Sequence, residues 1–174
     1  DQVTGYSLLG ATRQAFSGSI KADGASTYKL RLTETGAPAT AGVFELTLDT
    51  ANPKQLEGSW QSAQGNIKPK FFSLQKQQCR YVPTAGEYPE ASSRLLKDED
   101  LQVPKQQLQY MRNEIYARHN YSFSNREVAS YFAQADWYIP CSLDVASQLS
   151  KTEKENIRRI QLMEPYAEKV EWGR

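Results

Sequence analysis

The 174-residue chain is poor in the residues on which most metal and acid–base chemistry depends. It contains one histidine and two cysteines, too few for zinc sites built from His and Cys alone, unless carboxylates supply the other ligands. Nucleotide-binding motifs are also missing, because neither G-x-x-x-x-G-K-[ST] nor G-x-G-x-x-G after a strand occurs. We therefore expect no metal ion and no other cofactor.

An excess of charge of one sign and long apolar runs are missing too. The 21 Lys and Arg residues are balanced by 20 Asp and Glu residues, and the balance holds on both sides of residue 90. A protein that binds the phosphate backbone of nucleic acid usually has a basic surface, so we expect no nucleic-acid partner. No stretch approaches the roughly 18–20 uninterrupted apolar residues of a membrane-spanning helix, and we expect no transmembrane segment.

The first half of the chain has the two-residue period of half-buried strands. Its apolar positions are Phe16, Ile20, Tyr28, Leu30, Leu32, Phe44, Leu46, Leu48, Leu56, Trp60, Phe72 and Leu74. Short turn-forming segments separate the runs, which is typical of neighbouring antiparallel strands. The pattern predicts an antiparallel β domain over residues 1–82, a five- or six-stranded meander curled into an open or closed barrel. Adjacent Phe71 and Phe72 break the alternation and predict a bulge or a strand buried on both faces.

Residues 83–103 contain Pro, Gly, a Ser pair and the run Lys-Asp-Glu-Asp, a composition typical of a linker. Beyond this segment the period becomes helical, with Leu108, Met111, Ile115 and His119 on one stripe. The sequence therefore predicts an α+β protein in which a small β domain precedes a helical domain over residues 104–174.

Three helices are expected in this second domain. Pro104 suits the first turn of the first helix. Two capping boxes, Ser124-x-x-Glu127 and Ser150-x-x-Glu153, would begin the second and third helices. Pro165 would interrupt the third.

The first of these helices carries a recognisable motif. Tyr116, Ala117, Arg118 and His119 match the sequence from which the YARHG domain takes its name, and Asn120 stands where the family usually has Gly. Asn is the residue that best replaces Gly in the left-handed conformation that ends a helix. The resemblance continues through residues 131–132, 137–138 and 149–157 and covers roughly residues 92–166. It does not extend to the β domain.

This resemblance implies a location and no reaction. YARHG modules occur in bacterial secreted proteins and lipoproteins and in external regions of signalling and peptidase proteins. The resemblance therefore implies that the chain is extracytoplasmic, in the periplasm, attached to the outer membrane or secreted. A secretion signal or a lipid anchor upstream of Asp1 would fit that location.

Outside the cytoplasm, Cys79 and Cys141 are expected to form a disulfide. The bond would close a loop of about 60 residues, contribute on the order of 4 kcal/mol and staple the two halves together. Two free, buried thiols remain the alternative.

The polar residues of the motif permit two interpretations. Glu114 and Arg118 have the spacing of an ion pair on a helix surface. Alternatively, Asn113, Glu114, Tyr116 and Arg118 form a cluster that receives a ligand carboxylate or a peptide terminus, for which Arg is well suited. Exposure separates the two, because a buried cluster is scaffold and a cluster lining a groove is a site.

His119 and two aromatic residues also have alternative roles. His119 is expected to be buried and hydrogen-bonded at the end of the first helix. Acting as a general base would require a nearby nucleophile, for which Ser122, Ser124 or a free cysteine would have to serve. Trp137 and Tyr138 would fill the space between helices, or stack on a sugar or anchor a partner at the mouth of a cleft.

Together these features favour a non-enzymatic bacterial cell-envelope protein that binds a cell-wall fragment, a peptide or another envelope protein. No catalytic residue is assigned, and the oligomeric state stays open. The candidate ligand-binding residues are Asn113, Glu114, Tyr116, Arg118, His119, Trp137 and Tyr138. The alternatives are an envelope hydrolase that uses His119, a secreted inhibitor or modulator of an envelope enzyme, and a purely architectural spacer.

Overall fold

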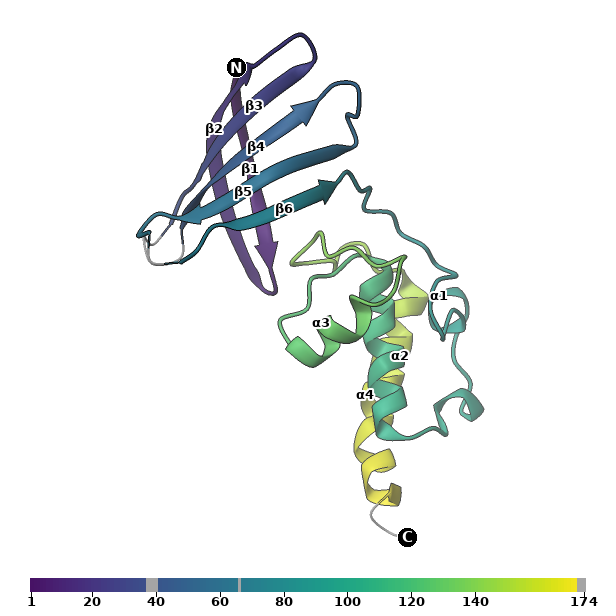
Figure 1. Ribbon diagram of the computed structural model, residues 1–174. Coiled ribbons are helices and arrows are strands. Elements are labelled where there is room, and N and C mark those ends of the chain that lie inside the picture. Colours follow the sequence, from purple (N-terminus) through teal and green to yellow (C-terminus); the bar gives the residue numbers. More distant parts are fainter. Residues whose placement is uncertain (37–40, 66, 172–174) are drawn as a thin grey trace. The chain divides into compact units, whose positions relative to one another are not determined.

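The chain forms two compact units, which we call the β unit (Asp1–Gln78) and the helical unit (Cys79–Arg174). The computed structural model describes residues 1–36, 41–65 and 67–171, without the side chains of Leu9 and of residues 168–171 (Figure 1). Strands are confined to the β unit and helices to the helical unit within these residues, which confirms the predicted α+β class. None of the described helices is long and apolar enough to cross a membrane.

The β unit is a six-stranded antiparallel meander, as predicted. Its strands are β1 (Gln2–Leu9), β2 (Thr12–Ala22), β3 (Thr27–Glu34), β4 (Gly42–Asp49), β5 (Gln55–Ser62) and β6 (Lys70–Gln75). Each strand pairs with the next in the sequence, in the order β1-β2-β3-β4-β5-β6. Because the pairings among the described residues join only consecutive strands, the sheet is open, with β1 and β6 at its edges.

One face of this sheet carries the apolar side chains of the β unit. Phe44 lies opposite both Leu32 and Trp60, and its ring centroid is 6.0 Å from that of Phe16 and 6.4 Å from that of Phe72. The indole N–H of Trp60 donates to Glu34 at 2.8 Å, which satisfies its polar atom. The two-residue period therefore predicted this face correctly.

The expectation for Phe71 and Phe72 is wrong. Phe71 is 82% exposed, whereas Phe72 is half-buried and contacts Phe44. The register with β5 runs through both residues without an extra one, so neighbouring side chains point to opposite faces, as in any regular strand. The pattern was misinterpreted because Phe71, an apolar residue, occupies a position that faces outward.

The described residues of the helical unit contain five helical segments, some very short. They are α1 (Glu90–Ser93), the 3₁₀ turn η1 (Glu99–Leu101), α2 (Lys105–Arg118), α3 (Arg126–Phe132) and α4 (Lys151–Glu171). Helices α2 and α4 run alongside each other (Figure 1). Their shared core consists of Ala91, Leu96, Leu101, Leu108, Met111, Ile115, Leu149, Ile157 and Ile160. An aromatic cluster around Phe123, Phe132 and Tyr138 joins α3 to the end of α2.

Residues 83–103 differ from the expected linker. They contain α1 and η1, and Ala91, Leu96 and Leu101 are buried in the core of the helical unit. Pro83, Gly86 and Pro89 lie in the turns and bends that precede α1, whereas the Ser pair belongs to α1 itself. A turn-rich composition does not distinguish such a wrapped segment from a solvated linker, and the compact unit starts at Cys79 rather than near residue 104.

The capping box that begins α4 is present as predicted. The backbone N–H of Glu153 donates to the hydroxyl of Ser150 at 3.1 Å, and the N–H of Ser150 donates to the carboxylate of Glu153 at 2.8 Å. Pro165, however, does not interrupt this helix, which continues to Glu171. A proline lacks one backbone donor, and a helix of 21 residues tolerates that loss.

The cap of α3 lies one residue further along than predicted. Asn125, not Ser124, accepts the backbone N–H groups of Glu127 and Val128, at 2.9 and 3.2 Å. Ser and Asn both cap helices well. The sequence alone therefore does not show which of the two neighbouring residues begins α3.

Gly18 provides a test of the sheet register. A Cβ atom built on Gly18 would lie 1.9 Å from the carbonyl oxygen of Arg31 on the neighbouring strand. We expect Gly18→Ala to destabilise the β unit by about 1–3 kcal/mol, because the strands would have to separate. Denaturant unfolding of the whole chain measures this, with Ser19→Ala on the same strand as the control. Equal stability of the two variants would contradict the register.

Candidate functional site

The carboxylate of Glu114 is a buried anchor for the segment that precedes α1. Glu114 is 3% exposed and accepts the backbone N–H groups of Glu87 and Tyr88 at 2.6 and 2.8 Å. Gly86 lies against it with a positive φ of 91°, and a Cβ atom there would be 1.6 Å from the carboxylate oxygen. Only glycine fits this position, so the chain closes over the carboxylate as tightly as a backbone can.

Arg118 is bound from the other side of the same carboxylate. Its Nη2 donates to Glu114 at 2.8 Å, its Nε to the carbonyl of Ala85 at 2.7 Å and its Nη1 to the hydroxyl of Ser92 at 2.9 Å. Arg118 is 1% exposed, so the pair is not on the helix surface. Burial raises the pKa of Glu114, while Arg118 and the two backbone N–H groups act in the opposite direction. Because the guanidinium of Arg118 already donates to three partners within the protein, the contacts favour the ion pair over a ligand-binding cluster.

His119 belongs to a second buried network at the end of α2. Its Nε2 lies 3.1 Å from both carboxylate oxygens of Glu153, and its ring stacks on Tyr81 with 4.3 Å between centroids. The hydroxyl of Tyr81 donates to the same carboxylate at 3.1 Å. His119 is 6% exposed. The geometry is that of a hydrogen-bonded residue that closes the helix.

The same contacts keep Glu153 ionised. Burial opposes the charged form, but hydrogen bonds from Ser150, Ser92 and His119 outweigh it and lower the pKa of Glu153 below 4.5. One carboxylate thus joins the start of α4, the end of α2 and the segment around Tyr81.

Asn120 has the conformation that the family's glycine implies, with φ 62°. Its side chain donates to the carbonyl of Arg80 at 3.0 Å, and its carbonyl accepts the N–H of Cys141 at 2.9 Å. Asn120 therefore serves the left-handed turn and also contacts the segment that contains Cys79.

The predicted disulfide is confirmed. Cys79 and Cys141 are bonded, with 6.3 Å between their Cα atoms and a sequence separation of 62. Both lie within the helical unit, so the expectation that the bond joins the two halves is wrong. As these are the only cysteines of the chain, the closed bond leaves no thiol to act with His119.

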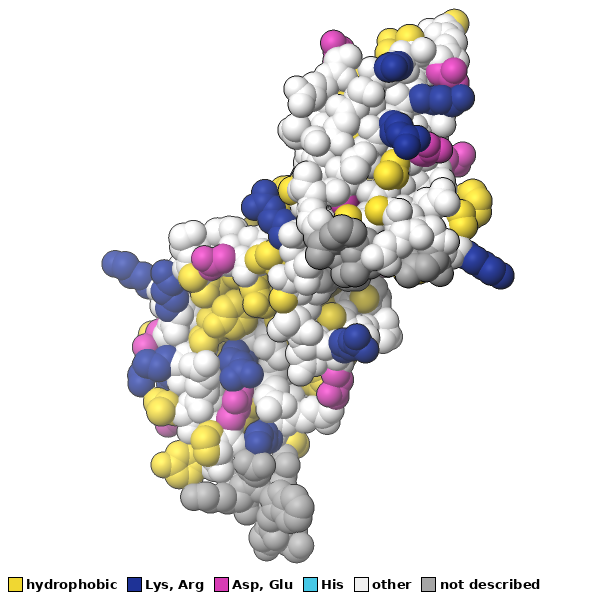
Figure 2. Space-filling model, turned by 90° about the vertical axis from the view of Figure 1, so that its left-hand side faces the viewer, with side chains coloured by type: hydrophobic (Ala, Val, Ile, Leu, Met, Phe, Trp, Pro, Cys, Tyr) yellow, Lys and Arg dark blue, Asp and Glu magenta, His cyan; other side chains and the backbone are white. Residues whose placement is uncertain are grey.

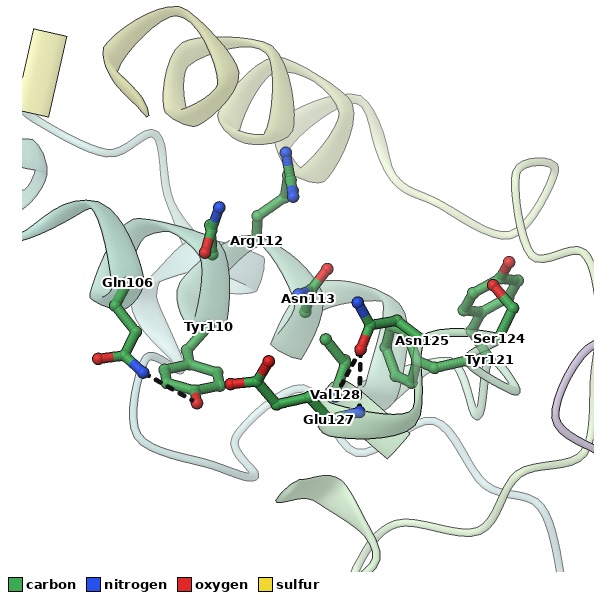
Figure 3. A pocket seen from close by; sticks show the side chains of 11 residues that line it. Gln106, Tyr110, Arg112, Asn113, Tyr121, Ser124, Asn125, Glu127 and Val128 are labelled. Atoms are coloured by element: carbon green, nitrogen blue, oxygen red, sulfur yellow. Dashed lines mark hydrogen bonds between the residues drawn. The ribbon is translucent and has the colours of Figure 1, made fainter. Parts of the chain in front are cut away.

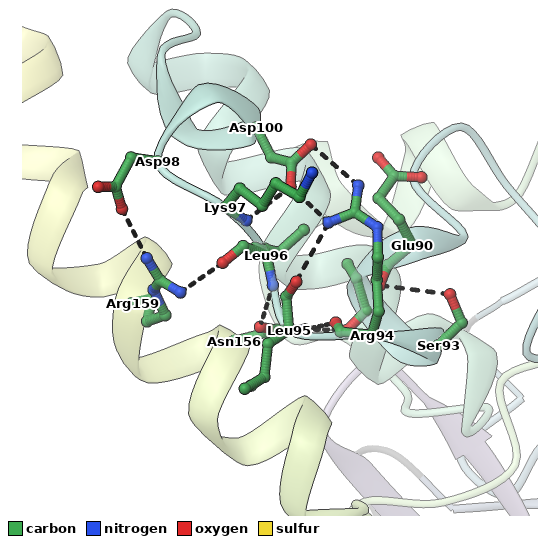
Figure 4. A network of polar contacts seen from close by, with 11 residues as sticks. Glu90, Ser93, Arg94, Leu95, Leu96, Lys97, Asp98, Asp100, Asn156 and Arg159 are labelled. Carbon is green, nitrogen blue, oxygen red and sulfur yellow. Dashed lines mark hydrogen bonds and ion pairs between the residues drawn. The ribbon is translucent and has the colours of Figure 1, made fainter.

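Asn156 of α4 holds the α1–η1 segment (Figure 4). It is fully buried, accepts the N–H of Leu96 at 2.9 Å and donates to the carbonyls of Ala91 and Arg94 at 2.8 and 2.7 Å. Nearby, Arg94 donates to both carboxylate oxygens of Asp100 at 2.6 and 3.0 Å. This pairing and the N–H of Lys97 lower the pKa of Asp100 to about 2.

The exposed side of α2 faces a hollow of about 280 Å³ (Figure 3). Figure 3 shows the carboxamides of Asn113 and Asn125 in its middle, with Tyr121 and Ser124 at one end and Tyr110 with Gln106 at the other. The full lining is Gln106, Gln109, Tyr110, Arg112, Asn113, Tyr121, Phe123, Ser124, Asn125, Glu127 and Val128. Amide and aromatic side chains dominate it.

A second hollow of about 510 Å³ adjoins the first. It is lined by Arg112, Asn113, Tyr116, Tyr121, Phe123, Leu143, Asp144, Val145, Ala146 and Gln161. Because Arg112, Asn113, Tyr121 and Phe123 line both hollows, we treat the two as one surface, the α2 groove. Its basic residue is engaged already, since Arg112 pairs with Glu164 at 2.9 Å.

The candidate residues from the sequence separate into two groups. Asn113 lines both hollows and Tyr116 the second. Glu114, Arg118 and His119 are buried in the networks described above and do not line the groove. Trp137 and Tyr138 pack in the aromatic cluster around Phe132, and burial raises the pKa of Tyr138 to about 12. Ligand binding by any of the seven stays a prediction.

Several groove residues were missed by sequence reasoning, among them Gln106 and Gln109. Together with the candidates Asn113 and Tyr116 they follow i, i+3, i+7 and i+10, which places all four on one polar stripe of α2. That spacing could have identified the face. Tyr121, Phe123 and Asn125 come from the following loop, and nothing in their spacing shows that they turn back to α2.

Metal chemistry has no support among the described residues, where no group of three or more His, Cys, Asp or Glu side chains could hold an ion. Asn113 has no hydrogen-bond partner for its carboxamide within the described part of the chain, although the neighbouring Glu114 has three. A ligand in the groove would thus find an amide donor and acceptor at Asn113.

In a comparison with protein families, residues 84–165 match the YARHG domain. The match starts upstream of the motif, within the segment that wraps over Glu114 and Arg118. This is an extracytoplasmic domain of unknown function. No curated protein and no solved structure matches significantly, and the β unit lies outside the matched residues.

The buried ion pair predicts a large loss of stability when one partner is neutralised. We expect Glu114→Gln to destabilise the helical unit by about 3–5 kcal/mol, because the variant leaves Arg118 buried without its counter-charge. Denaturant unfolding followed by helix content measures the loss. The exposed Glu155–Arg158 pair of α4 provides the control, and Glu155→Gln should change nothing measurable. Similar effects of the two substitutions would contradict the scaffold role of Glu114.

The low pKa of Glu153 predicts acid sensitivity. Since the folded-state pKa lies below 4.5, the carboxylate contributes stability that is present above about pH 4.5 and is lost as the pH falls through the folded-state value. Glu153→Gln should therefore destabilise the protein at neutral pH, and its difference from the wild type should narrow in acid. Unfolding free energies from neutral to about pH 3 test this, with the exposed Glu99→Gln as the control. A difference that stays constant with pH would refute it.

Proposed function

Because residues 84–165 form a YARHG domain, we propose that this chain is a non-enzymatic binding protein of the bacterial cell envelope. Its helical unit binds an envelope molecule in the α2 groove, and the charged residues of the motif maintain the fold that shapes the groove.

The contrast between neighbouring residues of α2 carries this proposal. Glu114 and Arg118 satisfy each other and the segment around Ala85 in the interior. Asn113 points to the other side, lines both hollows and has no partner for its carboxamide among the described residues. A half-buried amide without a partner loses hydrogen bonds that a ligand can restore.

The hydrolase alternative has little support in this arrangement. His119 directs Nε2 at the carboxylate of Glu153, and Tyr81 covers the ring. A general base must reach the proton it removes, and this imidazole is enclosed. The closed disulfide removes the thiol nucleophile as well.

A location outside the cytoplasm is part of the proposal. The Cys79–Cys141 bond is stable in oxidising compartments, and disulfides are rare in the cytosol. This agrees with the extracytoplasmic character of the family. The periplasm and the exterior of the cell are both compatible with the bond.

Retention by a cell-wall preparation tests the proposal. The whole chain should co-sediment with purified, insoluble wall material that carries both glycan strands and peptides. Asn113→Arg should reduce the retained fraction about tenfold, because a long charged side chain would fill the groove and be desolvated by the ligand. The matched control is Gln107→Arg, at an exposed position of α2 outside the groove.

Three results would contradict the proposed function. The first is equal retention of the two variants, and the second is no retention of the wild type. The third is turnover of wall glycan, peptide or ester bonds by the purified protein.

A further inference from the structure

The side chains that line the α2 groove restrict the class of ligand that it can bind. We infer that the groove is a saccharide-binding site with at least two subsites, which takes an uncharged oligosaccharide. This inference rests on the proposed function and names its ligand class.

Carboxamides are the commonest polar groups of the groove. Gln106, Gln109, Asn113 and Asn125 line the first hollow and Gln161 the second. Each carboxamide presents a donor and an acceptor side by side, which matches neighbouring sugar hydroxyls or an acetamido group. Asn125 uses its oxygen to cap α3, and its NH₂ group has no partner among the described residues.

Aromatic rings supply the apolar contacts. Tyr121 lines both hollows, and Tyr110 lines the first while stacking on Tyr131 at 4.2 Å between centroids. A ring fixed by a neighbour loses little entropy when it contacts a ligand. Sugars bring both a C–H face, which packs on such rings, and hydroxyls, which bind amides.

The charges in the groove favour a neutral ligand. Arg112 is paired with Glu164, and the acidic Glu127 and Asp144 lie at the walls of different hollows. On the face of the helical unit seen in Figure 2, basic and acidic side chains are interspersed around a patch of hydrophobic ones. No concentration of one sign is present there to select an anion.

Two features favour a saccharide over a peptide. Peptides commonly bind by adding a strand to a sheet edge or by laying an apolar helix in an apolar groove. The groove is formed by α2, α3, Gln161 of α4 and loops, and none of its lining residues belongs to the strands β1–β6. Its amides suit an apolar helix poorly. The two adjoining hollows share one wall, which suits a chain of linked sugar rings.

Calorimetric and NMR titration of the whole chain tests this. The probes are chitotetraose, cellotetraose and an end-capped tetra-alanine peptide. We expect saturable binding of at least one tetrasaccharide, with shifts of the side-chain NH₂ signals of Asn113 and Asn125. Asn113→Ala, which removes no hydrogen bond to any other described residue, should weaken binding about tenfold, and Tyr121→Leu by a similar factor. Gln107→Ala should bind like the wild type, and unfolding curves of all variants identify any loss of fold.

The outcomes separate this inference from the proposed function. If neither tetrasaccharide binds, or if Asn113→Ala binds as tightly as the wild type, the saccharide site is wrong. If the capped peptide alone saturates the groove, the ligand is a peptide and the proposed function stands. If the wall material does not retain the whole chain either, the proposed function fails together with the inference.

Discussion

The buried ion pair of Glu114 and Arg118 is the contact on which the helical unit depends. Taking two charges out of water is costly, and such a pair persists only when further hydrogen bonds satisfy both partners. Here the backbone of Ala85, Glu87 and Tyr88 supplies most of them. The segment bound in this way continues into α1 and brings Ala91 and Leu96 into the core. The same segment thus satisfies the buried charges and contributes apolar side chains to the core.

This arrangement divides α2 between two tasks. Its inner side carries the charged residues of the motif together with Leu108, Met111 and Ile115. Its outer side carries Gln106, Gln109, Tyr110, Asn113 and Tyr116, the amides and tyrosines of the groove that belong to this helix. The buried motif residues Glu114, Arg118 and His119 hold the fold. Ligand specificity would then depend on the outer side, to which Asn113 and Tyr116 belong, and on the loop after α2.

The sequence predicted the elements with a clear period and missed those defined by tertiary contacts. Alternating apolar residues identified the sheet, and the Ser150 box identified the start of α4. Residues 83–103 were mistaken for a linker. Their composition indicates turns, but it does not show that these turns form around the carboxylate of Glu114. The Glu114–Arg118 spacing predicted a pair correctly but not its burial, since Gly86 and Ala85 approach from 28 or more residues away. Only the part of the groove that lies on α2 could be recognised in the sequence, as a polar stripe.

Hydrogen exchange at the backbone amides of Glu87 and Tyr88 tests the central claim most directly. Both amides donate to the carboxylate of Glu114, in a segment without regular secondary structure. If the buried pair holds this segment, these two amides exchange only when the helical unit opens, as slowly as the core amides of α2. Exchange at the rate of a solvent-exposed loop would show that the segment is not held, and would contradict the account.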